Sequence, residues 1–143
     1  MIVKVKKLTK DAKLPAQALP GDVGFDLFAN EEVVLKPGER KLVGTGIKIA
    51  LPEGCEAQVR PKSGLAINHG ITVLNTPGTI DAGYRGEIKV ILINLSNEEF
   101  KVEKGQKIAQ MVFNKVEIPK LEEVEELDKT ARNERGFGST GLH

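Results

Sequence analysis

The stretch Gly78–Gly86, GTIDAGYRG, is the most informative part of this chain of 143 residues. It contains the only tyrosine, Tyr84, three residues after Asp81 and within a run of glycines. Apolar runs typical of strands flank it, Ile71–Leu74 on one side and Ile88–Ile93 on the other. Glycines, a proline and an aspartate between two such runs predict a hairpin with special backbone angles. Such a turn can hold a carboxylate and a ring beside a ligand, although an aspartate in a turn often only caps it.

Short apolar or alternating runs recur on both sides of this hairpin. Cys55–Arg60 alternates between apolar and polar residues, and turn-forming segments such as Lys36–Glu39, Pro52–Gly54 and Glu103–Gly105 separate the runs. Only Ser63–Asn68 suggests a short helical turn. Many short strands with Gly and Pro turns predict an all-β sandwich, jelly roll or barrel.

The length fits one domain with one core. We expect residues 1–128 to form this domain. The pattern Leu121, Val124, Leu127 has helical spacing but is short and follows Pro119, so we expect an irregular or extended segment there. Residues 129–143 are polar and basic and cannot bury enough surface to fold alone, which predicts a flexible C-terminal lid.

The overall composition excludes several classes of function. A formal net charge of +1 gives no field that would draw the protein onto nucleic acid or an acidic membrane. No apolar stretch approaches the roughly 18 residues that a membrane span needs. Cys55 is the only cysteine, which excludes an internal disulfide and fits the cytoplasm. With His69 and His143 the only histidines, any metal should be a hard cation held by oxygen atoms or by substrate phosphates.

Three further segments carry polar chemistry. Arg60–Ala66 contains two cations and a Ser-Gly pair. Free N–H groups at such a pair would suit an anion, and the alternative is that the pair simply begins a helix. Arg132–Gly141 combines glycines, hydroxyl groups and arginines, which suit phosphate oxygens, with a lone phenylalanine, which suits a flat base. The alternative is that this whole segment is a solvated chain end. Gly21–Leu27 places two carboxylates in what reads as a turn. Together with the hairpin, these segments indicate an enzyme acting on a nucleotide phosphate.

Five segments, in order and spacing, resemble the trimeric deoxyuridine triphosphate pyrophosphatase (dUTPase) family over nearly the whole chain. They are Asp22–Leu27, Arg60–Ala66, Gly78–Gly86, Gly105–Gln110 and Gly136–Gly141. The resemblance implies a jelly-roll-like β-clip subunit in a homotrimer, with active sites between subunits and a mobile C-terminal tail. The implied reaction is hydrolysis of dUTP to dUMP and diphosphate with Mg²⁺, which limits uracil incorporation into DNA and supplies dUMP for thymidylate synthesis.

The resemblance also implies roles for single residues of the hairpin. Asp81 would be the general base that deprotonates the attacking water. Tyr84 would pack against the deoxyribose and leave no room for a 2′-hydroxyl group. The remaining positions on this side would read uracil or lie near the substrate, and they are Asn75, Thr79, Ile80 and Lys89.

A second set of residues would bind the phosphates and the metal. Lys62, Ser63, Gly64 and Gln110 resemble the phosphate-binding set, and Asp26 a carboxylate that reaches the metal through water. In the tail, we expect Phe137 to stack on uracil. We expect the residues that follow it to contact the outer phosphate, namely Gly138, Ser139 and Thr140.

The chain departs from the family in one place. The family's tail usually begins with Arg-Gly, whereas this chain has Arg132-Asn133, with a second arginine at Arg135. Arg132 is the better positional match for the phosphate-gripping arginine, and the sequence leaves a role for Arg135 open.

Two other functions remain as alternatives, a dCTP deaminase and a nucleotide-binding trimer without turnover. The deaminase would need a carboxylate placed to move protons at the base. Products separate the three: diphosphate from dUTP, ammonia from dCTP, or neither.

Overall fold

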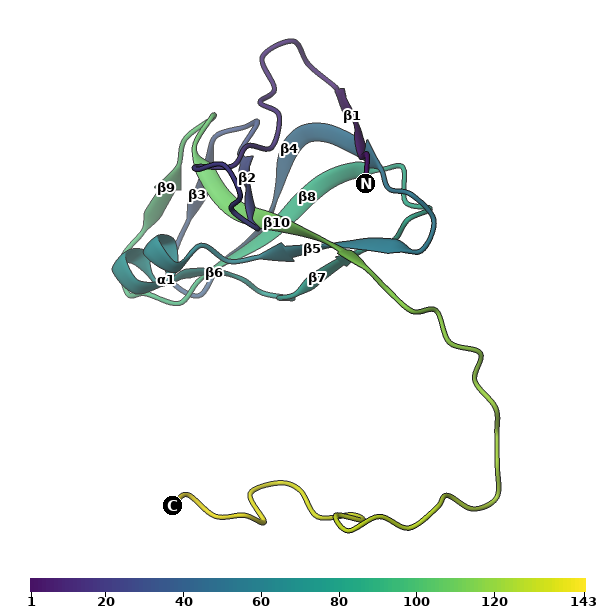
Figure 1. The fold of residues 1–143 in the computed structure, drawn as a ribbon. Coiled ribbons are helices and arrows are strands. Elements are labelled where there is room, and N and C mark those ends of the chain that lie inside the picture. The colour runs from purple at the N-terminus through teal and green to yellow at the C-terminus, as the bar shows by residue number, and fades with distance from the viewer.

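The computed structural model describes residues 1–143 and is built from short strands and one short helix (Figure 1). This confirms the all-β prediction. The strands are β1 (Lys4–Lys7), β2 (Phe25–Phe28), β3 (Val33–Leu35), β4 (Arg40–Ala50), β5 (Cys55–Arg60), β6 (Ile71–Val73), β7 (Gly78–Ile80), β8 (Glu87–Asn94), β9 (Phe100–Val102) and β10 (Lys107–Lys115), and the helix is α1 (Ser63–His69).

The strands form two four-stranded sheets and a small third one. The first sheet has the order β1-β4-β8-β6, the second β2-β10-β5-β7, and β3 pairs with β9. In Figure 1, β4 and β8 arch over the body while β5 and β7 run along its lower side. All the pairings within these sheets are antiparallel.

Alternation along the strands fills one core between the sheets. In β5, Cys55, Ala57 and Val59 are buried while the residues between them are half-buried. In β8, Val90 and Leu92 are fully buried. Each buried aliphatic side chain of this kind contributes about 1.5–3 kcal/mol to the stability of the fold. The sandwich therefore holds the ends of its connecting loops in place.

The strand β4 carries a bulge that fixes the start of β8. Its register against β8 shifts between Gly44 and Lys48. There Gly46 donates its N–H to Glu87 Oε2 at 3.2 Å, and the buried Thr45 hydroxyl donates to the carbonyl of Ile88. The first residues of β8, which follow the Gly78–Gly86 stretch, are therefore held by β4.

The prediction of a simple hairpin at Gly78–Gly86 was wrong in one respect. The flanking runs do pair, since β6 meets β8 with Ile71 opposite Asn94. However, Gly78–Ile80 forms β7, which joins the other sheet and pairs with β5.

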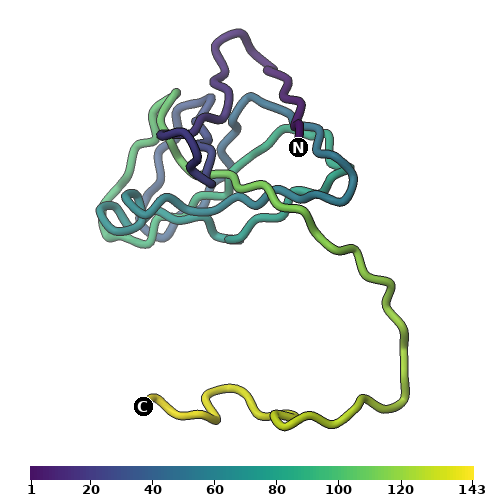
Figure 2. Tube along the Cα trace, in the orientation of Figure 1, coloured from purple at the N-terminus to yellow at the C-terminus, as the bar shows by residue number.

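Residues 116–143 leave the body after β10 and contain no helix or strand. Figure 2 shows this segment running away from the sandwich to the C-terminus. Ile118, Leu121 and Leu127 are exposed along it, and the irregular path expected around Leu121–Leu127 is confirmed. The helix α1 is too short to cross a membrane.

Candidate active site

A hollow of about 280 Å³ lies beside the turn that follows β7. It brings together five residues predicted from the sequence, Thr79, Ile80, Asp81, Tyr84 and Lys89. Four further residues complete its wall, namely Leu42, Glu87, Ile88 and Ile91. The sequence pattern marked Ile88 and Ile91 only as strand residues and gave no site role to Leu42 or Glu87, because their place beside the turn depends on how β4 and β8 pair.

Tyr84 is held through its backbone and through its ring. Its backbone N–H donates to the carbonyl of Asp81 at 3.1 Å, closing the turn. Its hydroxyl donates to the carbonyl of Glu87 at 2.9 Å. Tyr84 is 46% exposed, so the ring is anchored at its tip and is still partly open to solvent. An exposed carboxylate and a partly exposed aromatic ring thus belong to one tight turn.

β7 is the last strand of its sheet. Its outer edge therefore presents backbone N–H and C=O groups to which no strand is paired. Asn75 lies close by, with its Nδ2 3.3 Å from where a Cβ on Gly78 would stand. It is exposed and does not line the hollow. A flat polar ligand could form hydrogen bonds with such an edge. The order of N–H and C=O groups along the edge would then select the ligand's pattern of donors and acceptors.

The predicted phosphate-binding residues gather at α1. Lys62 is the N-cap residue, with extended backbone, and no side chain caps the helix. The first N–H groups of α1, from Ser63 and Gly64 onward, thus lack the partner that a capping side chain would supply. Gln110 on β10 donates from Nε2 to the carbonyl of Pro61 at 2.9 Å, which ties this loop to the sheet.

Gly24 makes room for Gln110. A Cβ on Gly24 would lie 3.1 Å from Gln110 Cδ, and closer still to its amide oxygen. The sequence placed both residues in motifs, but nothing in their spacing showed that they touch.

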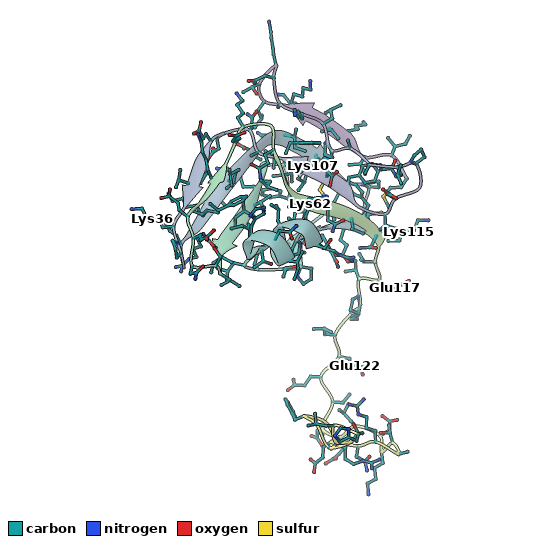
Figure 3. The ribbon with its side chains drawn as sticks, turned by 90° about the vertical axis from the view of Figure 1, so that its left-hand side faces the viewer. Lys36, Lys62, Lys107, Lys115, Glu117 and Glu122 are labelled. Carbon is teal, nitrogen blue, oxygen red and sulfur yellow. The ribbon has the colours of Figure 1, made fainter.

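Asp26 lies in β2 and not in a turn, which corrects the reading of Gly21–Leu27. It is 4% exposed and forms ion pairs with Lys62 and with Lys107, the latter at 3.3 Å. Figure 3 shows these two lysines near each other on the body. Burial by itself would raise the pKa of Asp26, but hydrogen bonds and charges from both lysines outweigh it and leave the pKa below its ordinary value.

The body offers no ready-made cage for a divalent cation. No group of three or more His, Cys, Asp or Glu side chains is placed to hold a metal. The ionised Asp26, with lysines on either side, suits a metal that arrives on a triphosphate and keeps its water, since Mg²⁺ is commonly held by one or two carboxylates plus substrate phosphates. Lys107 was not among the predicted residues. Its place in the Gly105–Gln110 motif was the one signal available.

The two groups lie at opposite ends of one sheet. Ile80 is opposite Ala57 in β5, so Asp81 comes level with Glu56, near the start of that strand. Lys62 follows the end of β5, and Gln110 is opposite Arg60. At about 3.3 Å per strand residue, Asp81 and Lys62 are about 20 Å apart along the sheet. The chain on its own does not bring its turn and the predicted phosphate-binding residues together.

The tail residues lie in a third place, on the segment that leaves the body. They surround a hollow of about 470 Å³, lined by Arg132, Arg135, Gly136, Phe137, Gly138, Ser139 and Thr140. Arg132 Nε donates to the carbonyl of Arg135 at 2.9 Å, and Arg135 donates to the carbonyl of Ala131 at 2.7 Å. Phe137 is fully exposed and has a φ of 50°, which is rare for a bulky residue. The tail thus has a compact turn of its own with an unburied ring.

Comparison with known proteins gives one consistent result. The sequence model of the dUTPase family matches residues 10–141. The deoxyuridine 5'-triphosphate nucleotidohydrolase of Clostridium novyi (strain NT) is 63% identical over 142 residues, covering 99% of this chain and 100% of the relative. That of Thermoanaerobacter sp. (strain X514) is 57% identical, with 99% of each chain covered.

Among solved structures, the fold matches the dUTPase of Staphylococcus bacteriophage 80alpha with dUPNHPP. The TM-score is 0.92 at 29% identity, with 99% of each chain covered. The two chains therefore share the whole jelly-roll-like subunit.

Proposed function

Because this chain belongs to the dUTPase family, we propose that it hydrolyses dUTP to dUMP and diphosphate. The observation that carries the proposal is the turn after β7, where Asp81 and Tyr84 line one hollow. In a cell this reaction would limit uracil incorporation into DNA and supply dUMP for thymidylate synthesis. The buried free thiol of Cys55 favours a cytoplasmic setting.

The base and the sugar are recognised at this turn. Uracil pairs with the outer edge of β7 around Thr79 and Ile80, with Asn75 beside it. Cytosine presents a different donor and acceptor pattern and would leave backbone groups unpaired, which costs about 1–3 kcal/mol for each buried group. Deoxyribose packs on the open face of Tyr84, where a 2′-hydroxyl group finds no space. Lys89 lines the same hollow and lies near the substrate.

Asp81 acts as the general base at the α-phosphorus. Its carboxylate accepts a proton from the attacking water, whose oxygen bonds to the α-phosphorus. The bond from that phosphorus to the bridging oxygen breaks, and this oxygen leaves with the diphosphate. A positioned base of this kind contributes about 10²–10⁴-fold to the rate.

The phosphates are held by Lys62, Ser63, Gly64 and Gln110. Asp26 would hold the water shell of Mg²⁺, and the ion would supply positive charge against the charge that develops on the phosphates. For this, Lys62 turns from Asp26 toward the phosphates. The lid, residues 129–143, then closes with Phe137 on uracil, Gly138, Ser139 and Thr140 at the outer phosphate, and Arg132 gripping the phosphate oxygens.

The working unit is a homotrimer. The turn and the phosphate-binding residues lie about 20 Å apart in one chain, whereas the α- and γ-phosphorus atoms of a triphosphate are only two P–O–P links apart. A closed threefold ring lets one chain supply the turn, another the phosphate-binding residues and another the tail.

The test is diphosphate release from dUTP with Mg²⁺, run beside dTTP, dCTP and UTP. We expect release from dUTP alone, and a loss of about 10²–10⁴-fold in kcat for Asp81→Asn with nucleotide binding kept. Near-normal turnover by Asp81→Asn would remove Asp81 as the base. Ammonia from dCTP would indicate the deaminase, and no product at all a binding trimer.

A further inference from the structure

We propose that Gly86 is a positioning residue that sets sugar selectivity, because only a residue without a side chain lets the Tyr84 ring lie where the deoxyribose packs. The proposal rests on the proposed function for the identity of the sugar. It adds a residue that touches no substrate itself and acts through the ring alone.

The tip of the Tyr84 ring lies directly against the backbone of Gly86. A Cβ built on Gly86 would stand 2.5 Å from Tyr84 Cζ and 2.8 Å from Cε1, and closer still to the hydroxyl oxygen. Real Cβ atoms do not approach other atoms so closely. Any side chain at position 86 therefore displaces the ring.

The ring cannot shift slightly and keep its anchor. Its hydroxyl donates to the carbonyl of Glu87 at 2.9 Å, and Glu87 is itself held, since its carboxylate accepts from the N–H of Gly46. The backbone N–H of Tyr84 donates to the carbonyl of Asp81, so the backbone that carries the ring is held as well. A methyl group on Gly86 therefore forces the ring to leave the Glu87 carbonyl and turn toward solvent.

The backbone does not require glycine at this position. Gly86 is not among the glycines with positive φ, so alanine adopts the same conformation without strain. Tyr84 is nearly half exposed, so the ring can swing out at little cost to folding. The effect of Gly86→Ala therefore falls on the ring position and not on the stability of the sandwich.

The first readout follows the ring directly. Tyr84 is the only tyrosine and the chain has no tryptophan, so protein labelled with 3-fluorotyrosine gives a single ¹⁹F resonance, from this ring. We expect Gly86→Ala to move that resonance toward the position seen in the urea-unfolded chain. Gly83→Ala is the matched control, because it lies in the same turn, has no positive φ and has no atom within 4 Å of its Cβ. It should leave the resonance in place.

The second readout is selectivity, measured as the ratio of kcat/KM for dUTP to that for UTP. We expect Gly86→Ala to lower this ratio about tenfold, which corresponds to about 1.4 kcal/mol. In a Tyr84→Ala background, where no ring remains to displace, Gly86→Ala should change the ratio no further. The comparison of Tyr84→Ala with the double variant also keeps the test valid if Gly86→Ala alone folds poorly, because the double variant has no ring for the alanine to clash with.

The outcomes are distinct. An unmoved resonance in Gly86→Ala, an unchanged ratio, or a full further loss in the Tyr84→Ala background would each overturn the proposal. Failure of the wild-type protein to release diphosphate from dUTP would instead overturn the proposed function, and the ¹⁹F signal would still decide whether Gly86 positions the ring.

Discussion

At the scale of residues, Asn133 bears on the one departure from the family's tail pattern. Its φ is 51°, in the left-handed region that glycine enters freely and that asparagine tolerates best among other residues. Its Oδ1 accepts from the N–H of Thr130 at 2.9 Å, and its own N–H donates to the Thr130 hydroxyl. Asparagine thus keeps a backbone that suits the family's glycine, which supports Arg132 as the phosphate-gripping arginine.

Asp26 leads to a prediction on pH. Its pKa is lowered in the folded protein, so its stabilising effect is complete above the ordinary aspartate pKa of about 3.9 and is lost as the pH falls through the folded value. We expect Asp26→Asn to lower the free energy of unfolding at pH 7 by about 1–3 kcal/mol, since two lysines lose their partner. Denaturant titrations of both proteins should show this difference shrinking below about pH 4.

A surface carboxylate provides the control for that experiment. Asp128 is exposed on the segment that leaves the body, so Asp128→Asn should be neutral throughout. A difference between wild type and Asp26→Asn that stays constant down to pH 2 would mean that the ion pairs are not its source.

At the scale of elements, local patterns predicted some strands well and others not at all. The alternation of Cys55–Arg60 predicted β5 with its observed bounds, and the Ser-Gly pair predicted the start of α1. β7 was read as a turn because glycine and proline surround it, and its strand character comes from pairing with β5, some twenty residues away. Asp26 was likewise read as a turn residue, because glycines precede it and its partners Lys62 and Lys107 are remote in sequence.

The same limit applies to the candidate site. Asp81 and Tyr84 were predictable because one short turn contains both. Glu87, Lys107 and the closeness of Gly24 to Gln110 were not, because each depends on the register of strands that no local pattern fixes.

The tail is an element whose removal should affect catalysis without affecting the fold. Its hydrogen bonds from Thr130 onward are all made within residues 130–141. We expect a chain truncated before Arg132 to keep its unfolding midpoint and to lose at least about 10²-fold in kcat/KM for dUTP, because the lid no longer completes the site. Circular dichroism and diphosphate release measure the two quantities.

A shorter truncation separates the lid from the chain end. Removing only Leu142 and His143, which lie beyond the last glycine of the tail, should leave both quantities unchanged. Unfolding of the longer truncation would instead mean that the tail is part of the core structure.

At the scale of the whole molecule, the proposed trimer predicts complementation between defective chains. An Asp81→Asn chain has a defective turn and an intact tail, whereas a chain truncated before Arg132 has an intact turn and no tail. If one site takes its turn and its tail from different chains, each mixed trimer contains one complete site in three. Random mixing at equal amounts should then recover about a quarter of wild-type activity.

Co-refolding of the two inactive proteins and assay of diphosphate release measures this recovery. Either protein refolded alone is the control and should stay inactive. Mixed trimers without recovery, verified by two affinity tags, would show that turn and tail act within one chain.

For the lid proposed above, the long segment after Lys115 determines how tightly the tail needs to bind. About twenty residues separate β10 from Phe137, and a flexible tether of that length has a root-mean-square span of about 25 Å. Such a tether holds the ring near a site at an effective concentration in the millimolar range. Closure then needs only weak contacts from a ring and a few hydroxyl groups. Weak contacts also break quickly, so the tether allows a lid that closes often and still lets diphosphate escape.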